Sequence, residues 1–269
     1  MRGPMGEIQR VFINTFPSWA CIVLLVLGLS IFVWSIFKAV NRYFPHWVHK
    51  ENSTFLPTIT IVTSANYGFL LGFVVIVLWQ AFNTAQSVTN AEANRLALFM
   101  YDVKAFPEDV RHDLTEGVGK YIHILIKDEW PAMKEGKTAP QAVEALNDLF
   151  PILQRYNPQT EVQKVFYREA VSNINQVIEK RRERLATVDS ILTDPLRILL
   201  VLGLFIIAFF LTLIASENRR VHIMSVMLVG CVVAFNMGVA MNLDYPFSGD
   251  VCIGNEVFTQ GILSQFAVK

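Results

Sequence analysis

Charge is scarce in this sequence, and it is missing altogether from four long stretches. Only 17% of the 269 residues are charged, against roughly 25% in typical soluble domains, and the mean hydropathy is +0.39. The uncharged stretches are Trp19 to Ile36, Leu56 to Phe82, Ile198 to Ala215 and Ile223 to Leu243. Because a bilayer core of about 30 Å takes about 20 apolar residues in a helix, each stretch can span it. The sequence therefore predicts an integral, multi-pass membrane protein.

The sequence also lacks the patterns of disulfide-rich, metal-binding and catalytic proteins. Cys21 and Cys231 fall in apolar stretches and Cys252 lies near the end, so no disulfide framework is expected. The histidines are scattered except for His46 and His49, where an interfacial role is favoured over metal binding. No phosphate-binding glycine loop, GxSxG or HExxH motif occurs. We therefore expect no enzymatic activity, no metal and no cofactor.

Excess positive charge is absent from the polar part of the chain. Residues 83 to 194 hold 14 Lys and Arg against 17 Asp and Glu, which gives 14 − 17 = −3. A nucleic-acid partner would call for a basic surface, so none is expected.

The first apolar stretch has two interpretations. Arg2 and Arg10 precede it, as positive residues precede the core of a signal peptide. However, it is longer than the roughly 7–15 residues of such a core, and it ends in Ile36-Phe37-Lys38 rather than in small residues. A retained membrane helix is favoured.

The chain divides into five parts, and its apolar spacing predicts an all-α fold. They are an N-terminal segment with the first span (1–55), the second span (56–82), a helical soluble domain (83–194), the third and fourth spans (195–243) and a C-terminal tail (244–269). Thr84 to Phe106 has no Pro or Gly, so the second span and this helix can be continuous. A helix is expected from Thr138 to about Leu153, and a longer one of roughly 50 Å from Pro158 to about Leu192.

Four spans place both termini and the soluble domain on the same side of the membrane. We expect that side to be the cytoplasm, and the membrane to be the cell membrane or a bacterial inner membrane. Lys and Arg counts favour this orientation only weakly, because long loops contribute little to the positive-inside rule.

Two side-chain stripes run along the second span. Ser64, Gly68 and Gly72 lie four apart, and so do Ala65, Phe69 and Phe73, and a four-residue step keeps side chains on one helix face. The small residues favour close helix packing, and so do three in the fourth span, Gly230, Ala234 and Gly238. The aromatic stripe either packs within a helical bundle or lines a pore.

Charged and polar residues outside these stripes are expected to have structural roles. Glu92 and Arg95 are three apart on a predicted helix, which favours a surface ion pair. The charge run from Glu179 to Arg184 is typical of a solvated helix face. Asn236 and Asn242 in the fourth span need partners or water. Asp244 is a candidate to pair with Arg219 or Arg197.

Several motifs resemble those of bestrophin channels, and more closely those of the bestrophin-like membrane protein family DUF4239. They are Phe69-Leu70-Leu71-Gly72-Phe73 followed by Trp79, Glu92 with Ala93, Tyr121 with Glu129-Trp130, and Leu243-Asp244-Tyr245-Pro246-Phe247-Ser248-Gly249. The last is the most specific, with Asp244, Pro246 and Gly249 as its distinctive residues. Together they cover roughly residues 55 to 258.

The resemblance implies a homo-oligomer such as a pentamer, embedded in membrane lipid, whose copies of the second span surround an ion pore. Its neck would consist of Ala65, Phe69 and Phe73, and Ile76 and Gln80 would also line the pore. Ala65 departs from the larger aliphatic residue of the family, which leaves the narrowness at that level open. Small inorganic ions, with chloride-like anions favoured, would pass passively. No counterpart of the calcium-binding acidic cluster of animal bestrophins follows the fourth span.

A second interpretation is a non-conducting membrane scaffold or sensor, whose helical soluble domain binds a partner. It predicts a monomer or dimer and a partner-binding groove on that domain, whereas a pore predicts a ring of subunits.

Overall fold

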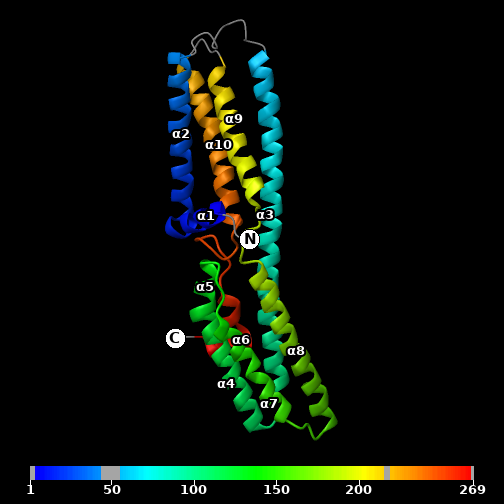
Figure 1. The fold of residues 1–269 in the computed structure, drawn as a ribbon. Coiled ribbons are helices and arrows are strands. Elements are labelled where there is room, and N and C mark those ends of the chain that lie inside the picture. The colour runs from blue at the N-terminus through cyan, green and yellow to red at the C-terminus, as the bar shows by residue number, and fades with distance from the viewer. Residues whose placement is uncertain (1–3, 44–54, 215–218, 268–269) are drawn as a thin grey trace. The chain divides into compact units, whose positions relative to one another are not determined.

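The computed structural model describes residues 4–43, 55–214 and 219–267, and these are helical without any β-strand. Figure 1 shows the order of the helices along the chain. Four described helices are long and apolar enough to cross a membrane. The predicted all-α fold with four spans is therefore confirmed. The chain forms two compact units, which we call the membrane unit (residues 1–81, 190–245 and 249–251) and the soluble unit (82–189, 246–248 and 252–269).

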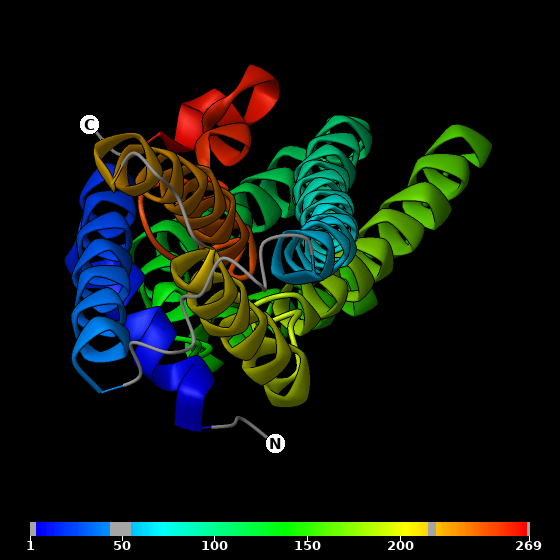
Figure 2. The same ribbon diagram turned by 90° about the horizontal axis from the view of Figure 1, so that it is seen from above.

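The membrane unit contains a short first helix and four spans. Its helices are α1 (Pro4–Thr15), α2 (Ser18–Tyr43), the first half of α3 (Phe55–Val103), α9 (Asp194–Leu213) and α10 (Arg219–Leu243). Figures 1 and 2 show α9 and α10 between α2 and the first half of α3. α3 therefore stands at one side of the group.

Small residues bring α10 close to α2. A Cβ added at Gly230 would lie 3.2 Å from Leu29, and one at Gly238 would lie 2.6 Å from Ile22. Ala234 is buried between these glycines, in a small core with Leu29. This stripe of α10 thus packs inside a single chain.

A tyrosine fixes α3 on α9. The hydroxyl of Tyr67 donates a hydrogen bond to the Leu200 carbonyl at 2.9 Å, and its ring lies directly over Gly203, where a Cβ would come within 2.6 Å. Since a side chain at position 203 would displace the ring, the glycine permits this close approach of the two helices.

α3 is a single helix of 49 residues, which confirms the expected continuity of the second span. Pro57 falls in its first turn, where the missing N–H is tolerated, and no proline follows before Pro107. At 1.5 Å per residue the helix is about 70 Å long. Its second half is the central helix of the soluble unit.

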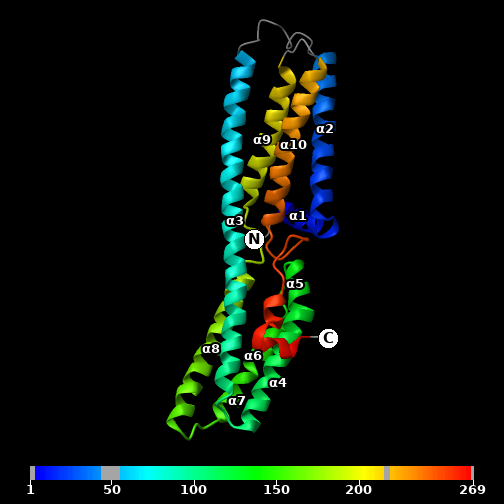
Figure 3. The ribbon, with the colours of Figure 1, turned by 180° about the vertical axis from the view of Figure 1, so that it is seen from behind.

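In the soluble unit, a long helix lies on one side of this second half of α3 and several short ones lie on the other, as Figure 3 shows from behind. They are α4 (Glu108–Ile124), a π-helical segment η3 (Leu125–Glu129), α5 (Trp130–Lys134), α6 (Pro140–Asn147), α7 (Leu149–Arg155), α8 (Glu161–Ala186) and the 3₁₀ turns η4 (Glu256–Thr259) and η5 (Gly261–Phe266). Leu96, Phe99 and Ile174 are among the residues of their shared apolar core.

Two expected soluble helices differ in the structure. The helix expected from Thr138 to Leu153 is split into α6 and α7, because Pro151 has no N–H for the carbonyl four residues earlier. The helix expected from Pro158 to Leu192 is shorter, running over 26 residues from Glu161 to Ala186. Thr160 begins it with a capping box, in which its side chain accepts from the backbone N–H of Gln163.

Candidate functional site

One face of α3 in the membrane unit is turned away from the other described helices of that unit. Phe69 and Phe73 are 72% and 68% exposed, and Ala65, Ile76 and Gln80 are exposed on the same face. The opposite face is buried, with Tyr67, Leu71, Val74 and Leu78 toward the rest of the unit. Within a single chain the Phe stripe therefore lies outside the packed bundle of the membrane unit, and its role as a pore lining stays a prediction.

The two stripes of α3 together form a shallow groove. It is lined by Ala65, Gly68, Phe69, Gly72, Phe73 and Ile76. A Cβ added at Gly68 or Gly72 would meet nothing within 4 Å. Ser64, the first residue of the small stripe, is half-buried. These glycines therefore relieve no crowding inside the chain, unlike Gly230 and Gly238 of α10.

A second candidate site is a buried cluster of charges in the soluble unit. Glu92 on α3 accepts from Arg184 Nε at 2.7 Å and from the Tyr121 hydroxyl at 2.6 Å. Arg184 Nη2 also donates to Glu129 at 2.7 Å, and Arg181 forms an ion pair with the same carboxylate. All five side chains are buried. The cluster holds two carboxylates and two guanidinium groups, so its charges balance.

This cluster corrects two sequence predictions. Glu92 does not form a surface ion pair with Arg95, whose guanidinium donates instead to Asn173 at 3.4 Å. The run from Glu179 to Arg184 is not wholly solvated, because Arg181 and Arg184 turn inward while Arg182 stays exposed. Arg184 lies 92 positions after Glu92, so local spacing could not reveal the pair.

Burial shifts the pKa values of side chains in this cluster. It raises the pKa of Tyr121 well above the ordinary value, and the charge of Glu92 raises it further. Burial alone would lower the pKa of Arg184, but the neighbouring carboxylates outweigh it and the pKa is raised. Tyr121 therefore stays a neutral donor and Arg184 stays charged at any physiological pH.

A shift in helix register places Glu129 in this cluster. Between α4 and α5 the chain forms π-helical turns, in which the Trp130 N–H bonds to the carbonyl of Leu125 five residues earlier. Pro131 follows and has no N–H to continue the α-helical ladder. The π-helical segment was not predicted, and the Trp-Pro pair inside a helical pattern is the signal that could have indicated it.

Trp130 connects the same region to the C-terminal tail. Its indole N–H donates to the Ile253 carbonyl at 3.1 Å, and its ring meets Phe247 edge-on at 5.8 Å between centroids. The guanidinium of Arg184 lies over the Trp130 ring, 4.9 Å from its centroid. Trp130 thus joins the buried charges to Ile253 and to Phe247 of the tail motif.

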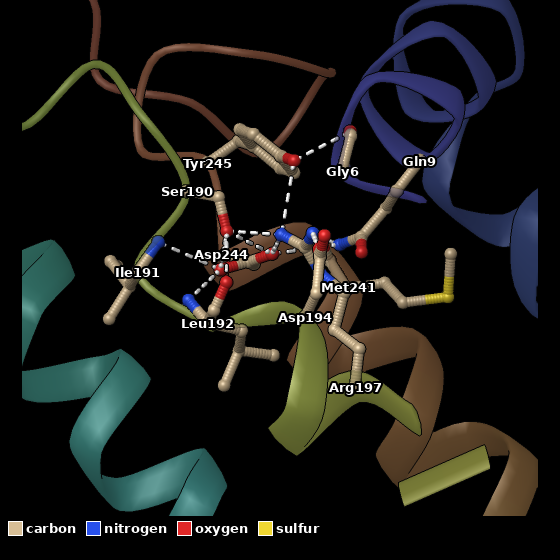
Figure 4. Close-up of polar contacts among 10 residues, drawn as sticks. All are labelled: Gly6, Gln9, Ser190, Ile191, Leu192, Asp194, Arg197, Met241, Asp244 and Tyr245. Atoms are coloured by element: carbon tan, nitrogen blue, oxygen red, sulfur yellow. Dashed lines mark hydrogen bonds and ion pairs between the residues drawn. The ribbon is translucent and has the colours of Figure 1, made fainter. Parts of the chain in front are cut away.

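The third candidate site, in Figure 4, surrounds Asp244 at the end of α10. The buried Asp244 carboxylate accepts from the backbone N–H groups of Ile191 and Leu192 at 3.0 and 2.7 Å. Arg197, at the start of α9, donates to it at 2.7 Å, and Ser190 donates at 2.8 Å. Of the two expected partners, Arg197 is therefore the one found. The other, Arg219, has a side chain outside the described residues.

Helix α1 reaches the same carboxylate from the other side. Gln9 donates to Asp244 at 3.2 Å and to the Met241 carbonyl at 3.1 Å, while the Tyr245 hydroxyl donates to the Gly6 carbonyl at 2.6 Å. We call this group of contacts the Asp244 junction. It ties the ends of α9 and α10 to the first helix of the chain.

Two further tail residues hold the corner between α1 and α2. Asp250 accepts from the backbone N–H and hydroxyl of Ser18, which begins α2, at distances of 2.6 to 3.0 Å. Gly249 adopts a φ of +78°, which favours glycine, and its N–H donates to the Asn14 side chain at 2.8 Å. The polar residues of the fourth span are also satisfied, since Asn236 and Asn242 donate to the carbonyls of Val232 and Gly238.

Comparison with known proteins identifies the family. The family model described as the bestrophin-like domain matches residues 16–258, which is most of the chain. The chain belongs to the bestrophin-like family. No curated protein and no solved structure matches it.

Within this bestrophin-like membrane protein, the family motifs have distinct structural roles. Glu92 and Trp130 belong to the buried centre of the soluble unit, and Asp244 is the centre of the junction in the membrane unit. Among residues 4–43, 55–214 and 219–267, no group of three or more His, Cys, Asp or Glu side chains is placed to hold a metal ion. The aromatic stripe of α3 is the motif that the single chain leaves exposed.

Proposed function

We propose that this bestrophin-like protein is a homo-oligomeric channel, in which copies of α3 surround a passive ion pore. The observation that carries the proposal is the exposed face of Ala65, Phe69, Phe73 and Ile76, which lies opposite the face that packs on the chain's other helices. Gln80 would extend this lining along the helix. The remaining helices of each chain would separate the pore from lipid.

The glycines beside the aromatic stripe support self-association of α3. A glycine in a helix interior costs roughly 0.5–1 kcal/mol relative to alanine, and Gly68 and Gly72 make room for nothing inside the chain. A neighbouring copy that approaches along this groove would use that room. The two stripes then have separate roles, one at the contact between copies and one toward the axis.

A ring of phenylalanine side chains has the properties of a selective constriction. It is too apolar to retain water well, so it can close by dewetting or admit weakly hydrated ions. The edges of aromatic rings carry partial positive charge, which favours anions over cations. Chloride-like anions are therefore the proposed permeant ions.

Recordings from purified protein in planar bilayers test this proposal. Wild-type protein should conduct, and Phe69→Ala and Phe73→Ala should change conductance or selectivity, because each widens the proposed neck. Phe235→Ala is the matched control, since Phe235 on α10 is 55% exposed but does not lie on α3. Absence of wild-type conductance, or equal effects of all three changes, would refute the pore.

A groove on the soluble unit favours the alternative of a scaffold or sensor that binds a partner. It has a volume of about 790 Å³, and its lining includes Lys104, Glu108, Arg111, His112 and Phe266. Measuring the mass of the protein–detergent complex separates the two functions. A ring of four or more chains supports the channel, whereas a monomer or dimer without conductance supports the scaffold.

A further inference from the structure

Helix α1 presents one face to the protein and a different face to its surroundings. Gly6, Gln9, Arg10 and Ile13 are buried, and the guanidinium of Arg10 lies 4.7 Å from the ring centroid of Tyr245. With the hydrogen bonds of Gln9 to Asp244, these contacts fix the rotation of α1 about its axis. The direction of its remaining faces is therefore set by the junction.

The outward face of α1 is mostly apolar and carries no charge. Ile8 and Val11 are 70% and 66% exposed, Met5 is also exposed, and Phe12 lies half-buried beside them. Their spacing of three and four residues places them on one arc of the helix. The exposed polar residues Glu7 and Asn14 lie outside this arc. Thr15 lies within it, but its hydroxyl is satisfied inside the helix, because it donates to the Val11 carbonyl at 2.7 Å. The helix thus has an inner face, an apolar face and a polar edge.

The position of α1 in the chain determines what can cover this apolar face. Only Phe16 and Pro17 separate α1 from α2, which is a candidate membrane span beginning at Ser18. Figure 1 shows α1 lying across the end of α2 rather than continuing it. The exposed Phe16 and Trp19 extend the apolar face onto the span itself. Aromatic residues, Trp and Tyr above all, are enriched at the interface between membrane and water, where a span begins.

We propose that α1 is an interfacial helix whose apolar face is inserted into the lipid bilayer. The occupant of the face is the boundary between lipid headgroups and acyl chains, where amphipathic helices beside membrane spans gain from burying apolar area. Gln9 and the Asp244 junction hold the helix in the plane of the membrane from the protein side. This role is independent of ion conduction, since it concerns the outer surface of each chain.

Spin labels on the full-length protein in phospholipid vesicles test the insertion. A single cysteine is introduced as Ile8→Cys or Val11→Cys after the native cysteines have been replaced, and its nitroxide depth is measured from collisions with oxygen and a water-soluble nickel chelate. Both labels should lie about 5–10 Å below the lipid phosphates. The matched control is Glu7→Cys on the polar edge of the same helix, whose label should collide mainly with the nickel chelate.

The two collision reagents also distinguish other occupants of the face. Labels at positions 8 and 11 that are as accessible to nickel as the label at position 7 would show a face in water, and would overturn the proposal. Labels shielded from both reagents would show a face covered by protein, such as a second copy of the chain, and would overturn it as well.

Discussion

At the scale of single residues, the buried charge cluster links several elements of the soluble unit. Arg184 is fully buried and contacts both Glu92 and Glu129, so it joins α3, η3 and α8. Removing charges from water is costly, and the mutual attraction of the groups offsets that cost only while every partner is present. The complete cluster is therefore expected to add little net stability, whereas loss of one partner should be strongly destabilising.

Glu129→Gln should destabilise the soluble unit by about 3–5 kcal/mol, because it leaves the buried Arg181 and Arg184 with a single carboxylate between them. Hydrogen exchange of the α8 amides, measured by mass spectrometry, reports this loss as faster opening. Glu116→Gln is the matched control, since Glu116 is exposed and its replacement should change stability by no more than about 0.5 kcal/mol. Equal exchange in the two variants would contradict the assigned role.

Asp250 should make the corner between α1 and α2 sensitive to acid. Its hydrogen bonds from Ser18 lower its pKa below the ordinary value of 3.8, so folding favours the charged carboxylate. The charged carboxylate therefore stabilises the folded protein above pH 3.8, and this stabilisation is lost as the pH falls through the lowered pKa. Thermal unfolding should show Asp250→Asn less stable than wild type near neutral pH, with the difference shrinking in acid. A difference independent of pH would contradict the role of the charge.

At the scale of elements, α3 is one unbroken helix with a packed face and an exposed face. Its buried face is fixed on α9 by Tyr67, so the groove of Gly68 and Gly72 has a defined outward direction. A rigid helix face with a fixed direction is well suited to symmetric association, because every copy presents the same surface.

Gly72→Leu should weaken association of the chains, because its side chain would fill the groove that a neighbouring α3 is proposed to enter. The expected result is a shift from a ring to smaller species in detergent, measured by light scattering during gel filtration. Gly28→Leu is the matched control, since Gly28 on α2 is also exposed with nothing within 4 Å of an added Cβ. Unchanged assembly of Gly72→Leu, or an equal loss with Gly28→Leu, would argue against the groove as an interface.

The sequence predicts these elements well where one local property decides the structure, and poorly where distant partners decide it. The lack of charge revealed the four spans, and the lack of proline and glycine after Phe82 revealed the continuity of α3. Glu92 was misassigned because local spacing suggests Arg95, whereas the fold supplies Arg184 from another helix. The exposure of Phe69 also depends on which helices lie beside α3, and periodicity alone cannot determine that.

At the scale of the whole molecule, the spans determine how the parts are distributed across the membrane. Family membership and four candidate spans make the chain a multi-pass bestrophin-like membrane protein. If all four candidate spans cross, their even number would place α1, the soluble unit and the C-terminal tail in one compartment. The same topology predicts that the segment between α2 and α3, which lies outside the described residues, is accessible from the other compartment.

Labelling with a membrane-impermeant maleimide should show this division. In a protein without native cysteines, Glu116→Cys reports the soluble unit and Ser53→Cys reports the loop between α2 and α3. We expect the first to react only in inside-out vesicles and the second only in intact cells, because we place the soluble unit in the cytoplasm. Reaction of both positions from one side would refute four crossings. A reversed pattern would keep the four crossings but overturn the orientation, so each part of the topology is tested separately.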